Sequence, residues 1–171
     1  MHYAAKDVTG LADALKPQKN RVYSDVRLRI LTGRDATRAN ILDSAESFFA
    51  EAGQEDIAVL FVSGHGMNSS SGYYFIAHDS TPDRLSSTGV PWTFFDEILK
   101  TVKSSVLLLA DTCHSDNIAG NEKWKTQAQA DPNEFLRESA KSGVIVFASS
   151  SGSTISREDP SGATAHLPKP S

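Results

Sequence analysis

The chain has 171 residues and a formal charge of −4, with 39% hydrophobic residues. That length suits one domain with a substantial core, and the acidic balance gives no reason to expect nucleic acid or an anionic membrane surface as a partner. No apolar run approaches the roughly 20 residues that span a bilayer, and a single cysteine without a visible secretory signal predicts a reducing, cytoplasmic location.

Apolar periodicity predicts helices and strands in the first half of the chain. Helical spacing predicts a helix over 3–15, and alternation of apolar and charged residues over 25–31 predicts a strand with one covered face. Asp35 or Thr37 can cap a following helix, whose apolar stripe runs over 41–49.

The second half repeats this pattern around two continuous apolar runs. The predicted elements are a strand over 57–63, a Gly/Ser/Asn loop over 64–72, a strand over 73–77, a turn around Pro82, a helix over 91–102, a strand over 105–110, a loop over 116–130, a helix over 131–141 and a strand over 143–148. Such alternation predicts an α/β fold with a mainly parallel sheet and helices on both faces.

Both apolar runs end in a reactive residue. The run 57–63 leads into Gly64-His65-Gly66, and the run 105–110 leads into Asp111-Thr112-Cys113. In parallel sheets, ligands collect beyond the carboxyl ends of the strands. A histidine and a thiol delivered to that edge form the arrangement that a nucleophilic protease needs.

The chemistry of these residues assigns each a role. A thiol attacks carbonyls as thiolate and has an ordinary pKa of about 8.5, so Cys113 needs a base, which His65 can supply. The small Gly64 and Gly66 would let the backbone turn sharply and let substrate approach. The amides of Gly66 and Cys113 could face the oxyanion of a tetrahedral intermediate.

Other interpretations of the same residues stay open. Cys113 can be a small buried residue and His65 an ordinary loop residue. His114 is a rival base, but its position next to Cys113 in an extended segment should point it to the opposite side. A zinc site formed by His65, His78, Cys113 and His114 is conceivable, although none of the usual ligand spacings is present.

Two motifs resemble those of the caspase-like cysteine peptidases, most closely the bacterial and metacaspase branch. Val62-Ser63-Gly64-His65-Gly66 is similar to the family's histidine motif, and Asp111-Thr112-Cys113-His114-Ser115 is similar to its cysteine motif in the metacaspase form. A histidine roughly 50 residues before the nucleophile is a known caspase feature. The segments 3–7, 37–42 and 143–150 also match typical family segments.

The resemblance implies a peptide-bond hydrolase with His65 as general base and Cys113 as nucleophile. In metacaspases the pocket for the residue before the cut is acidic, and the matching positions here are Asp7, Ser63 and Asp111. Two carboxylates and one hydroxyl suit the charged side chains of Arg and Lys. The expected partners are therefore proteins or peptides with basic residues, cut after Arg or Lys and not after Asp.

The resemblance also divides the single domain, 1–171, into parts. Residues 1–118 correspond to a large subunit, 119–130 to a variable loop and 131–171 to part of a small subunit. Relatives often cut themselves between the two parts, so lysines at 123 and 125 are candidate cleavage sites, with an ordinary solvated loop as the alternative. No cofactor is expected. Calcium activates some metacaspases, but the sequence shows no calcium-loop motif.

The chain departs from the family at both ends. The apolar strand with which relatives begin is missing, and so are the helix and strand that follow the position of Pro160. We therefore expect four main parallel strands where six are usual. These departures favour a second hypothesis, a non-catalytic caspase-like interaction module or inactive fragment. A third is a related cysteine peptidase or transferase with another substrate.

Overall fold

The computed structural model describes residues 2–69, 71–114 and 144–148, and for positions 2, 3, 113, 114 and 148 the backbone alone. Within these residues, five strands form one sheet in the order β3-β2-β1-β4-β5. The strands are β1 (Ile57–Ser69), β2 (Gly72–Phe75), β3 (Val90–Pro91), β4 (Ser105–His114) and β5 (Ile145–Ala148). Strands β1, β4 and β5 are parallel, while β2 and β3 are added antiparallel at one end.

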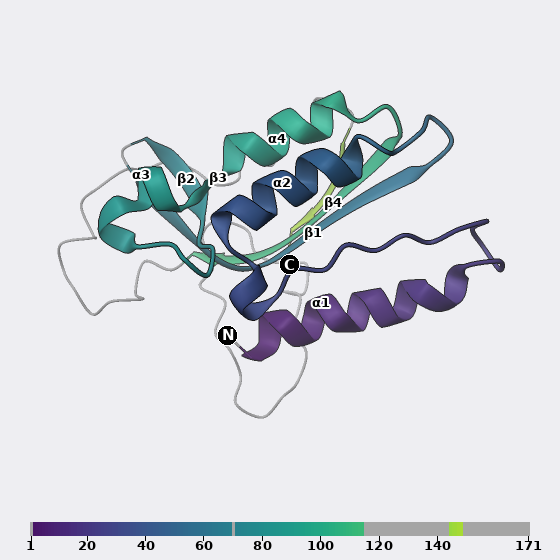
Figure 1. Ribbon diagram of the computed structural model, residues 1–171, viewed down its shortest axis with the longest axis horizontal. Coiled ribbons are helices and arrows are strands. Elements are labelled where there is room, and N and C mark those ends of the chain that lie inside the picture. Colours follow the sequence, from purple (N-terminus) through teal and green to yellow (C-terminus); the bar gives the residue numbers. More distant parts are fainter. Residues whose placement is uncertain (1, 70, 115–143, 149–171) are drawn as a thin grey trace, which may run out of the picture.

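Helices cover both faces of the sheet. Figure 1 shows α2 (Arg38–Phe49) and α4 (Trp92–Thr101) together on one side and α1 (His2–Leu15) on the other, while the short α3 (Leu85–Thr88) lies near β2 and β3. The predicted α/β fold, with a mainly parallel sheet and helices on both faces, is confirmed. Among the described residues, no helix is long and apolar enough to cross a membrane.

Local sequence signals explain where these helices begin. The Thr37 side chain accepts a hydrogen bond from the Asn40 amide at 3.3 Å, so Thr37 is the cap of α2. Pro91 lies immediately before α4, where its fixed φ and missing N–H are tolerated. Both starts follow the sequence prediction.

The main core lies between the sheet and the α2–α4 pair. Even-numbered residues of β1 and β4 face these two helices and are buried with them, because alternate residues of a strand share one face. The core residues of these four elements are Ala45, Phe49, Ala58, Val62, Trp92, Phe95, Leu99, Val106, Leu108 and Ala110. Odd-numbered residues therefore lie on the other face of the sheet, the side of α1 (Figure 1).

The strand predicted over 25–31 is wrong. Its alternation is real, since Val26 and Leu28 are half-buried while Arg27 and Arg29 are exposed. The segment is extended, yet it forms no ladder. In the described part of the chain, the edge of β1 before Gly66 has no strand partner. The described residues accordingly hold three parallel strands, not the expected four.

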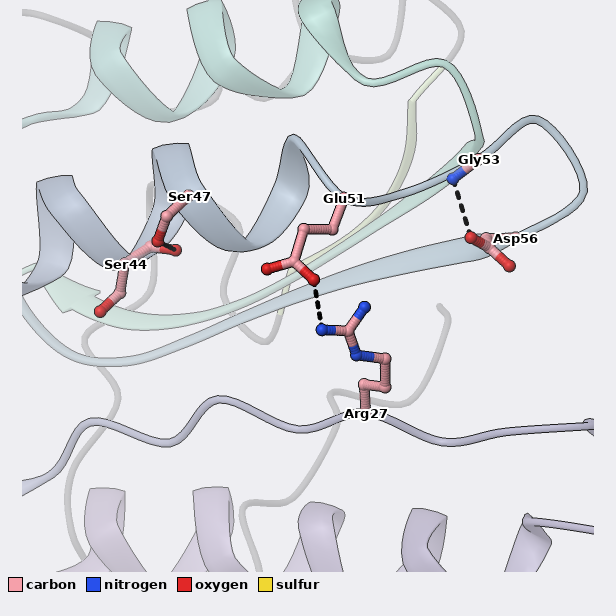
Figure 2. Close-up of polar contacts among 6 residues, drawn as sticks. All are labelled: Arg27, Ser44, Ser47, Glu51, Gly53 and Asp56. Atoms are coloured by element: carbon pink, nitrogen blue, oxygen red, sulfur yellow. Dashed lines mark hydrogen bonds and ion pairs between the residues drawn. The ribbon is translucent and has the colours of Figure 1, made fainter.

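Exposed ion pairs link this unpaired segment to neighbouring residues. Figure 2 shows Arg27 reaching from the segment to Glu51, just beyond the end of α2, where the two side chains form an ion pair. At the start of the segment, Asp25 forms a second ion pair, with 2.6 Å between its Oδ1 and Lys19 Nζ. The hydrogen bond from Lys19, aided by the Val26 amide, holds the pKa of Asp25 below its ordinary value. These contacts are exposed, so each contributes little to stability.

Two further predictions need correction. The loop predicted over 64–72 is wrong, because β1 continues to Ser69 and β2 begins at Gly72. The strand predicted over 105–110 is longer, since β4 continues to His114. The loop over 116–130, including both candidate self-cleavage sites, and the helix over 131–141 lie outside the described residues.

Leu108→Ala should lower the free energy of unfolding by about 2–5 kcal/mol, because Leu108 is 1% exposed in the middle of the sheet and its loss leaves a cavity. Leu107→Ala truncates the half-buried neighbour on the other face and should cost less. Urea unfolding followed by circular dichroism measures both. Equal losses would contradict the assignment of the main core to the α2–α4 face.

Candidate active site

The two predicted reactive residues occupy paired positions on neighbouring strands. In the parallel ladder between β1 and β4, His65 is the register partner of Cys113. Neighbouring strands lie about 4.8 Å apart, and register partners lie on the same face of a sheet. Residues 48 positions apart in the chain are thereby placed next to each other, one register step before the β1–β4 ladder ends.

The predicted pocket residues fall on the same face. Ser63 is the register partner of Asp111, two positions before His65 and Cys113, so both pairs share the odd-numbered face of the sheet. Ser63 and Asp111 are half-buried. The third predicted residue, Asp7, is an exposed residue of α1, the helix on this side of the sheet.

The imidazole of His65 is half-buried within β1. Its backbone oxygen accepts a hydrogen bond from the Ile76 amide at 2.9 Å, which fixes the main chain at this point. Its Nδ1 is buried and has no hydrogen-bond partner among the described residues. Histidine can transfer a proton through a ring nitrogen near neutral pH, so Nδ1 is a candidate for that role.

The glycines that flank His65 make room for aromatic rings on the opposite face. A Cβ at Gly66 would lie 1.7 Å from the Tyr73 hydroxyl oxygen, and one at Gly64 would lie 3.0 Å from the Phe75 ring. Gly64 also has a φ of +153°, which side chains disfavour. The sharp turn predicted for this pair is wrong, because both residues continue strand β1.

The other candidate residues are placed apart from this pairing. His114 pairs with Gly66 one register step further on. His78 is exposed, and its amide donates to the Ala36 oxygen at 2.8 Å. In the described ranges, no group of three or more His, Cys, Asp or Glu residues could hold a metal ion.

One contact near the site was not predicted from the sequence. The Tyr73 hydroxyl of β2 donates a hydrogen bond to Thr112 Oγ1 of β4 at 3.1 Å, across the intervening strand β1. From the sequence, Tyr73 is predicted only to begin a short strand. No local signal reveals such a contact, because it depends on the order of strands in the sheet and on the missing side chain of Gly66.

Comparison with known proteins gives a match to a family model. A family model described as the caspase domain, of the peptidase C14 class, matches residues 1–166. No curated protein and no solved structure matches the chain. The family match spans both strands of the His65–Cys113 pair and the helices on each face of the sheet.

Gly66→Ala should destabilise the fold by about 1–3 kcal/mol, because the added methyl overlaps the Tyr73 hydroxyl and ring. The matched control is Gly10→Ala in α1, where the added Cβ meets nothing within 4 Å. That change should stabilise the helix by up to about 1 kcal/mol. Thermal unfolding compares the two variants. A Gly66→Ala protein as stable as wild type would contradict the close approach of Tyr73.

Proposed function

Because the chain belongs to the caspase-domain family of peptidases, we propose that it is a cysteine endopeptidase that uses a Cys113–His65 dyad and cuts after Arg or Lys. The observation that supports the dyad is the register of β1 and β4, which pairs the two residues on adjacent strands. A single cysteine in the chain leaves Cys113 as the one available thiol nucleophile. We place this activity in the cytoplasm, where a lone thiol stays reduced.

In the first half of the proposed reaction, His65 takes the proton of the Cys113 thiol. The thiolate then adds to the carbonyl carbon of the scissile peptide bond, and the electron pair of the C=O bond moves to oxygen. Amide groups at Gly66 and Cys113 stabilise that oxyanion in this proposal. Collapse of the intermediate breaks the C–N bond, and His65 gives its proton to the leaving amine, leaving a thioester on Cys113.

The second half releases the enzyme. His65 takes a proton from a water molecule, and the hydroxide attacks the thioester carbonyl. The C–S bond breaks, the sulfur leaves as thiolate and recovers the proton from imidazolium, and the product is a carboxylic acid. The Nδ1 of His65 has no hydrogen-bond partner among the described residues, which supports this role, since histidine takes up and releases a proton near neutral pH.

The proposed specificity depends on the acidic residues beside the dyad. Asp111 and Ser63 are register partners two positions before Cys113 and His65, on the same face of the sheet. With Asp7 on α1, they would offer two carboxylates and a hydroxyl to the substrate side chain before the cut. Such a pocket suits the guanidinium of Arg or the ammonium of Lys and repels a carboxylate.

Cys113→Ala should abolish cleavage of a fluorogenic peptide ending in Arg, and His65→Ala should lower kcat by at least about 1,000-fold, because each removes a reacting group. The control is Ser104→Ala, a change at the residue before β4 that leaves both motifs intact. Circular dichroism verifies that every variant is folded. Residual cleavage by Cys113→Ala equal to wild type would refute the dyad, and a folded wild-type chain without cleavage would favour the non-catalytic module.

Asp111→Asn should lower kcat/KM for an Arg-ending peptide by about tenfold, because a charge-assisted contact to the substrate cation is lost. Asp43→Asn is the matched control: it makes the same change in net charge at an exposed position of α2, on the far face of the sheet. Steady-state kinetics on Arg-ending and Asp-ending peptides tests both. Faster cleavage after Asp than after Arg in the wild type would refute the basic specificity.

A further inference from the structure

The side chain of Tyr73 crosses strand β1 on the face of the sheet opposite the candidate dyad. Tyr73 lies on β2, and its ring passes over Gly66 of β1. Its hydroxyl donates to Thr112 Oγ1 on β4 at 3.1 Å. Thr112 immediately precedes Cys113, and its register partner Gly64 immediately precedes His65. The bond therefore reaches the residue before Cys113, on the strand pair that carries both proposed catalytic residues.

The ring of Tyr73 is held firmly enough to act as a fixed donor. The residue is 3% exposed, and its ring centroid lies 5.6 Å from that of Trp92 at the start of α4. Trp92 in turn lies 5.4 Å from Phe95 in an edge-on arrangement. Aromatic contacts of this kind stabilise the packed position of the ring, from which the hydroxyl reaches Thr112.

The hydrogen bond to Thr112 lies near the end of the ladder between β1 and β4. Gly66 and His114 form the last register pair, one position after His65 and Cys113. The terminal residues of a strand pair open more readily than its centre. The hydrogen bond from Tyr73 to Thr112 opposes that opening. It lies on the face opposite the dyad, so it leaves free the space where substrate would bind.

We propose that Tyr73 is a positioning residue, which holds the end of β4 through Thr112 so that the Cys113 thiol and the His65 imidazole stay within proton-transfer reach. This inference rests on the proposed function. Without the Tyr73 hydroxyl, the thiol and the imidazole separate more often, and the thiolate is less often stabilised by its neighbour. The thiol then titrates closer to the ordinary cysteine pKa of about 8.5.

The test measures the pH dependence of Cys113 alkylation by iodoacetamide, which reports one thiol because the chain has one cysteine. Tyr73→Phe should move the alkylation profile to higher pH and slow labelling at pH 6.5 by about three- to tenfold, as expected for loss of one hydrogen bond in a positioned site. It should lower kcat on the Arg-ending peptide by a similar factor and leave KM unchanged.

The matched control is Tyr74→Phe. Tyr74 is the next residue of β2, is also buried, and its hydroxyl shares a hydrogen bond with Ser71 Oγ at 2.9 Å, away from β4. Removing this hydroxyl should leave the alkylation profile unchanged. On the acceptor side, Thr112→Val should reproduce the effect of Tyr73→Phe, Thr112→Ser should restore the wild-type profile, and the Tyr73→Phe/Thr112→Val double variant should add nothing further.

The outcomes distinguish failure of the proposed peptidase function from failure of the positioning role of Tyr73. A wild-type thiol that titrates like free cysteine, with no peptide cleavage, refutes the proposed function. A reactive wild-type thiol whose profile is the same in Tyr73→Phe, or shifts equally in Tyr74→Phe, refutes the positioning role alone. Faster amide hydrogen exchange at 110–114 in Tyr73→Phe, with Tyr74→Phe unchanged, supports the hold on the end of β4.

Discussion

The parallel pairing of β1 with β4 determines which residues form the core and which residues meet at the candidate site. It runs from Ile57–Ser105 to Gly66–His114 without a shift in register. A slip of one residue would place His65 beside Thr112 or His114 and would turn one strand's side chains to the other face. The register is fixed by burial, because the even-numbered residues of both strands must face α2 and α4. The hydrophobic core thus sets the neighbour of His65 as well as the stability of the fold.

The two faces of the sheet differ in packing and polarity. The face toward α2 and α4 is closely packed, and the side chains missing from Gly64 and Gly66 leave space there for the rings of Phe75 and Tyr73. The face toward α1 holds the polar rows, Ser63 with Asp111 and His65 with Cys113, and is buried only in part. The polar rows thus lie outside the closely packed core, where burial of their side chains would cost more.

The sequence alone predicted the centre of the fold and less of its edges. The apolar runs 57–63 and 105–110 located the two central strands, and periodicity located all three longer helices. It failed over 25–31, since alternation reports a half-covered extended chain and carries no information about a hydrogen-bonding neighbour. Contacts across strands, such as Tyr73 to Thr112, depend on strand order, which local patterns do not contain.

The β1–β4 ladder extends beyond the apolar runs, so the reactive residues lie on paired backbone. Hydrophobicity marks burial, so the predicted strands stopped where the polar residues Gly64 and Asp111 begin. The ladder nevertheless continues, because backbone pairing does not require apolar side chains. Residues on paired strands keep their geometry better than residues on loops. The same hydrogen bonds that lengthen β1 and β4 therefore deliver His65 and Cys113 to adjacent positions on a supported backbone.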